Sequence, residues 1–204
     1  MSKYVWLLDA GHGGIIDGVY QTNGKRSPIW PDGRQLFEGE FNRDIVNRIS
    51  GMLNNASIHN FILVKDNTDV SLADRVIRAN NINMGNNGFT VYLSIHANAG
   101  GGSGYEVFTT KGQTKADAFA TVFYKELGKE FPTMKGRPDV SDGDPDKEES
   151  FYVLKYSNMP AILTENFFMD TLNPDCELIM SEEGRQRIAK AHYNAIMYIE
   201  SNRL

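Results

Sequence analysis

Short apolar runs alternate along this chain with longer segments in which apolar residues recur at helical spacing. Runs with the length and composition of buried strands occupy residues 4–8, 60–65, 89–96 and 104–109, and two more short apolar runs occupy residues 151–154 and 161–167. Helical periodicity covers residues 38–56, 71–83, 114–131 and 182–201. Strands that alternate with helices predict an α/β fold: a single domain over residues 1–204, with a mostly parallel twisted sheet and helices on both faces.

Local signals refine this pattern at three places. Ser71, with Asp74 three residues later, is a helix-start signal. Residues 15–37 form a polar connection longer than ordinary loops, which favours a functional loop. Residues 136–150 carry six acids against Arg137 and Lys147, and we expect them to form a surface loop, either ordered or mobile.

Composition and charge narrow the class of protein. The 204 residues can bury one substantial core, and 41% hydrophobic and 23% charged residues are typical of an ordinary globular protein. A net charge of −5 gives no basic surface for nucleic acid or anionic membranes. No segment approaches the ~20 apolar residues of a membrane span, and the first apolar run begins too early for a signal peptide to precede it. The single cysteine, Cys176, excludes an internal disulfide framework, and we expect a monomer.

Two of the four histidines follow apolar strands and precede glycine-rich turns. His12 lies in YVWLLDAGHGG, and His96 lies in SIHANAGGG after the third predicted strand. Glycine beside a histidine permits positive φ, and the carboxyl edge of a sheet is where ligands bind. Position alone leaves both residues equally open to two interpretations, metal ligand or turn residue. His59 fits a solvated loop residue, and His192 fits a packed or half-exposed residue of the last helix.

Three glutamates could act with these histidines. Glu38 and Glu40 stand at the start of the first predicted helix, where either could complete a His₂Glu metal site or only stabilise the helix dipole. Glu165 lies within the apolar run PAILTENFFMD, where burial would raise the pKa of its carboxyl toward neutrality and suit it to act as a general base. The alternative for Glu165 is an ion pair with a facing helix. Ser94 and Asn98, which flank His96, could contact a substrate or only satisfy backbone groups.

A second metal site is a minor alternative. Asp142, Asp144 and Asp146 are spaced like the start of a calcium loop. Lys147 stands where that loop requires glycine, and Val153 stands where it requires a bidentate glutamate. The spacing therefore only weakly favours calcium.

Taken together, these segments resemble one family, the zinc-dependent N-acetylmuramoyl-L-alanine amidases of type 3. These enzymes cleave peptidoglycan and occur in phage endolysins and bacterial autolysins. The matching pieces follow family order: DAGHGG with His12, EGEFN with Glu38, DNTDVSLADRVIRANN, SIHANA with His96, GYEVF, and MPAILTENFF with Glu165. This chain departs from the family where it reads TENFFMDTLNP in place of V-E-x-G-F-x-S-N-P. The segment 136–150 and the loop around Trp30 have no counterpart in the family pattern.

The resemblance implies Zn²⁺ as the cofactor and assigns the site residues: three metal ligands, His12, Glu38 and His96, and a catalytic glutamate, Glu165. The family places its zinc-binding glutamate four residues before an asparagine, and Asn42 selects Glu38 over Glu40 on this criterion. The implied reaction is hydrolysis of the amide between N-acetylmuramic acid and L-alanine by a zinc-activated water. Glu165 would take the proton and pass it to the departing amine.

The implied partner is peptidoglycan, as a muropeptide substrate, with no nucleic acid and no membrane insertion. The enzyme would act on the bacterial cell wall, either secreted or periplasmic, or held in the cytoplasm until it is released as a phage lysin. Two other functions stay open. A zinc peptidase that cuts within the stem peptide needs the same metal and base. A non-catalytic peptidoglycan-binding module is disfavoured because all four site residues are present.

Overall fold

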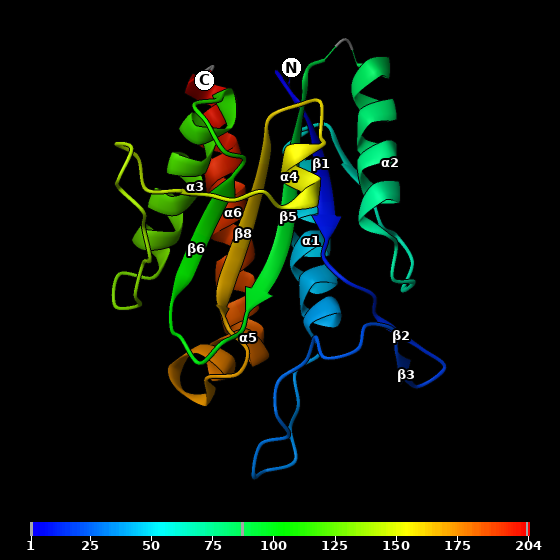
Figure 1. The fold of residues 1–204 in the computed structure, drawn as a ribbon, viewed down its shortest axis with the longest axis vertical. Coiled ribbons are helices and arrows are strands. Elements are labelled where there is room, and N and C mark those ends of the chain that lie inside the picture. The colour runs from blue at the N-terminus through cyan, green and yellow to red at the C-terminus, as the bar shows by residue number, and fades with distance from the viewer. Residues whose placement is uncertain (1, 87, 203) are drawn as a thin grey trace.

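The chain is built around a six-stranded sheet with helices on both of its faces (Figure 1). The computed structural model describes residues 2–86, 88–202 and 204. The strand order is β4-β1-β5-β8-β6-β7, and the strands are Val5–Ala10 (β1), Asn60–Ile62 (β4), Thr90–Asn98 (β5), Tyr105–Thr109 (β6), Lys147–Glu148 (β7) and Ala161–Phe168 (β8). Neighbouring strands are parallel except β6 with β8. The predicted α/β fold with a mostly parallel sheet is confirmed.

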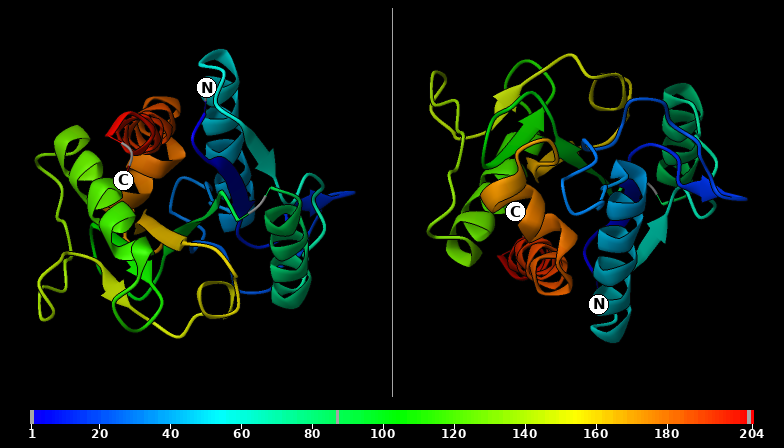
Figure 2. Two further views of the ribbon diagram at one scale, coloured as in Figure 1. Left: turned by 90° about the horizontal axis from the view of Figure 1, so that it is seen from above. Right: turned by 90° about the horizontal axis from the view of Figure 1, so that it is seen from below.

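Three long helices cover one face of the sheet, and two helices cover the other, as Figure 2 shows. The first group is Glu38–Asn55 (α1), Lys115–Glu130 (α3) and Glu182–Asn202 (α6), and the second is Leu72–Gly85 (α2) and the one-turn helix Tyr152–Lys155 (α4). Along β1, Trp6 and Leu8 pack in the core beneath the first group, whereas Val5 and Leu7 pack beneath the second. The strand is therefore buried on both faces, which explains its continuous apolar run.

The four predicted helices are present, and each boundary lies within two residues of its predicted place. Ser71 caps α2 as expected, because its Oγ accepts a hydrogen bond from the backbone N–H of Asp74 at 3.1 Å. None of the helices in the described residues combines the length and the apolar character needed to cross a membrane.

Short elements occupy the segments between the long helices and the strands of the main sheet. The long polar loop contains a two-stranded hairpin, Ile15–Ile16 (β2) with Val19–Tyr20 (β3). Of the two late apolar runs, 161–167 is strand β8, whereas 151–154 lies mainly in helix α4. The acidic segment 136–150 is a loop that ends in the short edge strand β7. A π-helical turn, Leu172–Cys176, and a short helix, Glu177–Met180 (α5), lead from β8 to α6.

The carboxyl ends of β1, β5 and β8 meet at one edge of the sheet, the lower end in Figure 1. The three strands are adjacent and parallel, so whatever follows or ends one of them lies beside the ends of the other two. His12, His96 and Glu165, which were candidate site residues from the sequence, lie on these three strands or directly after them.

Candidate metal centre

The parallel strands bring two histidines and a glutamate to the same edge. His12 lies two residues beyond the end of β1, and His96 lies near the end of β5. The two imidazole rings have their centroids 4.9 Å apart and stand nearly perpendicular, at 89°. Glu165 of β8 is the cross-strand partner of His96. Strand pairing thus places side by side three residues that are far apart in the sequence.

Glu38 completes the cluster from the first turn of α1. It is 1% exposed, and its Oε1 lies 3.2 Å from His12 Nε2 and 3.1 Å from His96 Nδ1. One potential ligand atom from each of these three residues lies within 4.8 Å of the others. Glu40 instead accepts a hydrogen bond from the backbone N–H of Ile15 at 2.8 Å, and so holds the long loop.

The cluster requires glycine at position 11, because the backbone there passes very close to the His96 ring. A Cβ atom on Gly11 would lie 2.1 Å from Cε1 of the His96 ring, far inside van der Waals contact. Any side chain at this position would therefore displace the imidazole.

Two ligand atoms of the cluster, His12 Nε2 and Glu38 Oε2, are buried without a hydrogen-bond partner in the described part of the chain, and so is Oε2 of the neighbouring Glu165. His12 Nε2 is near Glu38, but the contact does not have the geometry of a hydrogen bond. Buried polar atoms are nearly always paired, so this set fits a bound cation. Two imidazole nitrogens and a carboxylate are a donor set that zinc uses, with a fourth position for water or substrate. The residues present therefore fit a zinc ion.

Burial and mutual charge determine the protonation of the three candidate ligands. Burial opposes ionisation of Glu38, but the close contacts of its carboxylate with His12 and His96 outweigh burial and hold the pKa of the carboxyl below its usual value. Burial lowers the pKa of His12. Burial acts in the same direction on His96, but its contact with Glu38 raises the pKa of this imidazole above the usual value. Glu38 is therefore held as a carboxylate, the form that binds metals.

Glu165 has the environment of a general base. Burial raises the pKa of its carboxyl to about 7. The nearby basic side chains form ion pairs with Glu106, the cross-strand partner of Glu165 on β6. Arg137 Nε lies 2.8 Å and Lys147 Nζ lies 2.5 Å from Glu106 Oε1. Within the described residues no basic side chain forms an ion pair with Glu165, so the alternative of a structural ion pair finds no support.

A buried charge network that the sequence reasoning missed supports the His12 loop. His12 has a φ of 65°, in the left-handed region, and its carbonyl oxygen accepts hydrogen bonds from Arg43 Nη1 at 2.9 Å and Arg75 Nη2 at 3.2 Å. Arg75 also donates to the Ala10 carbonyl at 2.6 Å and pairs with Asp9 at 2.5 Å. The sequence did contain a pointer to Arg75, because this residue ends the D-x-S-L-x-x-R pattern within DNTDVSLADRVIRANN, one of the segments that resemble the family.

The polar residues beside His96 are bound to buried carboxylates. Ser94 Oγ donates to Asp9 Oδ2 at 3.0 Å, although Ser94 also lines the cleft described below. The side-chain amide of Asn98 donates to Glu106. Asn98 Oδ1 also accepts a hydrogen bond from the backbone N–H of Ala99 at 2.8 Å, so Asn98 satisfies a backbone group as anticipated, whereas Ser94 binds a side chain.

The other two histidines lie outside the cluster. His59 is exposed in the turn before β4. His192 is buried in α6, where Nδ1 lies 2.8 Å from the Ile188 carbonyl and Nε2 lies 2.9 Å from Thr164 Oγ1. These positions agree with the predictions, a solvated loop residue for His59 and a packed helix residue for His192.

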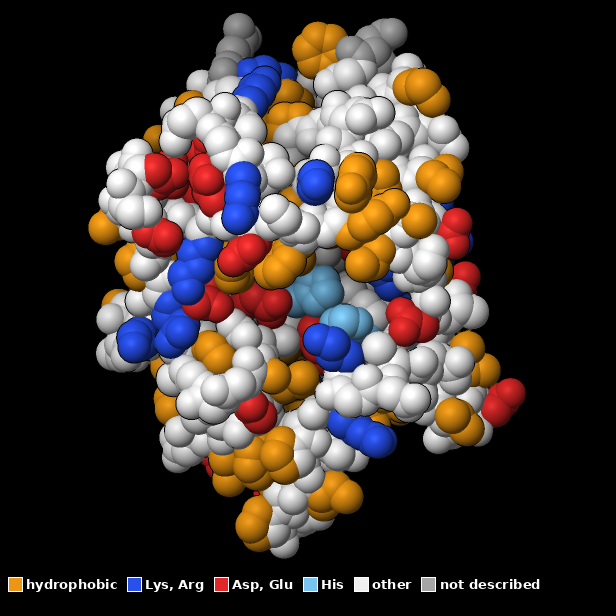
Figure 3. Space-filling model, viewed as in Figure 1, with side chains coloured by type: hydrophobic (Ala, Val, Ile, Leu, Met, Phe, Trp, Pro, Cys, Tyr) orange, Lys and Arg blue, Asp and Glu red, His pale blue; other side chains and the backbone are white. Residues whose placement is uncertain are grey.

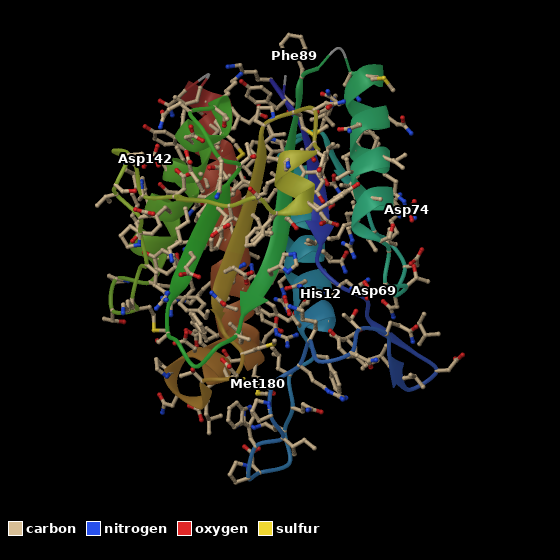
Figure 4. The ribbon with its side chains drawn as sticks, in the orientation of Figure 1. His12, Asp69, Asp74, Phe89, Asp142 and Met180 are labelled. Carbon is tan, nitrogen blue, oxygen red and sulfur yellow. The ribbon has the colours of Figure 1, made fainter. Side chains whose placement is uncertain are left out.

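The acidic loop does not form a second cluster of this kind. In the part of the chain that the structure describes, the only group of three metal-binding side chains with ligand atoms this close is the His12, Glu38 and His96 group. Figure 4 labels Asp142 at upper left, far from His12. Among the described residues, Asp144 and Asp146 each bury a carboxylate oxygen without a hydrogen-bond partner, but Asp142 does not join them in a group of three ligands, so the calcium loop stays a minor alternative.

A cleft of about 550 Å³ gives solvent access to the cluster. His12, His96 and Glu165 line it together with the loop before α2, where Figure 4 labels Asp69 near His12. Figure 3 shows the histidines, in pale blue, within a hollow bordered by charged and hydrophobic side chains. A concave site that joins a cation-binding cluster to a carboxyl group of raised pKa is suited to hydrolytic chemistry.

Comparison with known proteins places this site in a family context. The Amidase_3 family model, described as N-acetylmuramoyl-L-alanine amidase, matches residues 7–198. The N-acetylmuramoyl-L-alanine amidase CwlM of Bacillus licheniformis is 31% identical over 193 residues, which are 93% of this chain and 66% of that protein. The endolysin of Bacillus phage SPP1 is 29% identical over 202 residues, which are 98% of this chain and 66% of that protein.

Solved structures agree with these sequence relatives. The N-acetylmuramoyl-L-alanine amidase of Clostridium difficile 630 shares the fold, with a TM-score of 0.78 and 24% identity over 100% of both chains. This chain spans 66% of the length of the curated relatives named above, so its match to them is a match to part of each. Because the family model covers nearly all of the sequence, the chain belongs to the Amidase_3 family of N-acetylmuramoyl-L-alanine amidases.

Proposed function

We propose that this protein is a zinc-dependent N-acetylmuramoyl-L-alanine amidase that acts on the peptidoglycan of bacterial cell walls. It would hydrolyse the amide that joins the lactyl group of N-acetylmuramic acid to L-alanine. The observation that carries this proposal is the convergence of His12, Glu38 and His96 beside Glu165, at an open cleft that both histidines and Glu165 line. The family and the printed activity of its relatives supply the substrate.

In this proposal His12, Glu38 and His96 hold the zinc ion. When bound, the ion would supply Lewis acidity, which polarises a carbonyl group and lowers the pKa of water. The backbone contacts of His12 with Arg43 and Arg75 fix the loop that carries this imidazole.

Glu165 moves the proton. A carboxyl group with a pKa of about 7 is present in both protonation states near neutral pH. As carboxylate it accepts a proton from the attacking water, and as carboxylic acid it donates that proton to the departing amine of L-alanine. Without this donation the amine would leave as an anion, which is a poor leaving group.

The Glu165→Gln variant tests this role. The amide keeps the shape of the side chain but cannot accept the proton, so we expect wall hydrolysis to fall by about 10²- to 10⁴-fold with zinc content unchanged. Glu183→Gln, an exposed change at the start of α6, is the matched control and should keep full activity. Hydrolysis that survives in Glu165→Gln, with zinc bound, would show that another group is the base.

Mass spectrometry of the released fragments separates the amidase from its nearest rival. An amidase releases peptides that begin with L-alanine and leaves an intact lactyl group on the sugar. A zinc peptidase would leave L-alanine on the sugar, and a non-catalytic binding module would release nothing.

A further inference from the structure

One wall of the cleft is unusually aromatic. Phe151, Tyr152 and Tyr156 are 38%, 39% and 48% exposed, and Leu72 at the start of α2 is 55% exposed. Figure 3 shows hydrophobic side chains gathered directly above the histidines, over the region of α4. Large apolar side chains that cluster on an open surface mark an interaction site.

This aromatic surface is held rigidly. Helix α4 buries Val153 and Leu154 in the core, which turns its other side outward. Phe151 packs against Phe108 with ring centroids 5.2 Å apart, and Tyr152 packs against Tyr156 at 4.5 Å. Rings fixed in this way lose little conformational entropy when a ligand stacks on them.

Contacts between α2 and the residues that directly follow α4 fix the position of this helix as well. Asn80 Nδ2 donates to the Tyr156 carbonyl at 3.1 Å, and Asn80 Oδ1 accepts the backbone N–H of Asn158 at 2.8 Å. The aromatic surface is therefore built onto the scaffold and does not hang on a free loop.

The surface continues into the proposed active site. Leu72, Phe151 and Tyr152 line the same cleft as His12 and Glu165. A single ligand can therefore contact the aromatic wall and reach the proposed active site at the same time.

The remaining wall of the cleft has the opposite character. It includes Thr22, Asn23, Lys25 and Asp69, which are polar or charged. The substrate is divided in the same way at its scissile amide. On one side are N-acetylated sugar rings, which are uncharged and present apolar C–H faces. On the other side is a peptide with charged groups.

Resting on the proposed function, we propose that the aromatic surface of Phe151, Tyr152, Tyr156 and Leu72 binds the sugar rings of the glycan strand. Aromatic rings combine a large apolar face with a polar edge, which suits stacking against a sugar. The stem peptide then lies toward Lys25 and Asp69, whose charges complement its carboxylate and amine groups. The two walls together orient the substrate across the metal centre.

A peptide-free glycan tests this assignment without any catalysis. The probe is a tetrasaccharide of alternating N-acetylglucosamine and N-acetylmuramic acid, with its lactyl carboxyl groups esterified so that it is uncharged, titrated into the full chain by calorimetry or NMR. We expect Tyr152→Ala and Tyr156→Ala each to weaken binding about tenfold, whereas Tyr152→Phe, which keeps the ring, should bind within about twofold of the parent. Tyr198→Ala removes an equally exposed tyrosine from α6, and it should have no effect.

Kinetics on two substrates supply the second arm. Tyr152→Ala should raise KM for a peptide-substituted tetrasaccharide about tenfold, and leave KM for a single N-acetylmuramoyl peptide nearly unchanged. Lys25→Gln should raise KM for both substrates and leave binding of the peptide-free glycan unchanged.

Two outcomes would overturn the assignment: failure of the parent protein to bind the tetrasaccharide, or equal binding by the parent and the Tyr152→Ala, Tyr156→Ala double variant. Absence of hydrolysis with normal glycan binding would instead contradict the proposed function and keep the aromatic surface as a glycan site. The two proposals therefore fail separately.

Discussion

At the scale of single residues, the candidate centre depends on backbone held in an uncommon conformation. His12 adopts positive φ although it is not glycine, which is unfavourable for an L-residue, and two arginines bind its carbonyl. Arg75 is 2% exposed, so its charge needs the pairing that Asp9 provides. The loop that carries this imidazole is thus held through its backbone by a network of charged side chains.

Arg75→Lys tests the importance of this network. Lysine keeps the positive charge beside Asp9, but it lacks the planar fork that reaches Asp9, Ala10 and His12 together. Loss of support for a metal ligand typically costs 10- to 100-fold in affinity, and we expect zinc affinity to fall by about this factor. Competition with a chromophoric chelator measures it. Arg78→Gln, an exposed change on the same helix, is the control, and an unchanged zinc affinity in Arg75→Lys would show that His12 needs no such support.

At the scale of elements, strand β8 links the site to the helices behind the sheet. Phe167, which stands where the family pattern has glycine, has a φ of 66° and is fully buried. Its ring packs edge-on against Phe131, with centroids 5.0 Å apart. Aromatic packing thus offsets a backbone conformation that favours glycine. On the same strand, Thr164 lies 2.9 Å from the buried His192 of α6.

The contact between β8 and α6 predicts a pH dependence of stability. Burial lowers the pKa of His192 from 6.5 to about 4, so the folded protein keeps this imidazole neutral while the unfolded chain protonates it. The unfolded state then binds more protons, and stability falls as pH decreases from about 6.5 toward 4. Between pH 7 and pH 5 the contribution is about 2 kcal/mol.

Urea unfolding of the parent, His192→Gln and His59→Gln at the two pH values measures this contribution. His192→Gln should be destabilised at pH 7 but lose about 2 kcal/mol less than the parent on acidification. His59→Gln, at an exposed histidine, should follow the parent. Equal acid sensitivity of the parent and His192→Gln would contradict the assignment.

At the scale of the whole molecule, a metal ion at the candidate centre would link three separate elements at one edge of the sheet. The candidate ligands come from the loop after β1, the start of α1 and the end of β5, so a bound ion links elements that are distant in the sequence. A ligand that binds only the folded state adds about 4 kcal/mol when its concentration is 1,000 times its Kd. Folding and metal occupancy are therefore expected to be coupled.

Chelation tests this coupling without any assay of activity. Removal of zinc from the parent protein should lower Tm by roughly 10 °C, and added zinc should restore it. Glu38→Gln, which removes the carboxylate ligand, should show no such zinc-dependent shift, whereas Asp142→Asn in the acidic loop should respond like the parent. A parent Tm that is insensitive to chelation and to added zinc would count against a structural link through the metal.

Much of this architecture follows from local sequence. Apolar runs and helical periodicity are properties of neighbouring residues, and they predicted the mostly parallel sheet and all four long helices. Burial on both faces explains why β1 reads as a continuous apolar run, and Ser71 with Asp74 marked the start of α2. The resemblance added the candidate site residues, and their roles as zinc ligands and base stay predictions until metal and activity are measured.

Other features depend on how distant segments meet, and only the tertiary structure decided them. Residues two apart on a helix point in different directions, so local sequence alone left Glu38 and Glu40 open and only the family resemblance selected Glu38. Which of the two faces the histidines depends physically on how α1 docks against the sheet. A four-residue apolar run does not distinguish strand from helix, so α4 and its aromatic surface were not predictable. Arg75 reaches His12 across 63 sequence positions. Local periodicity determines elements because it acts between neighbours, whereas side-chain partners are determined by packing that exists only once the chain is folded.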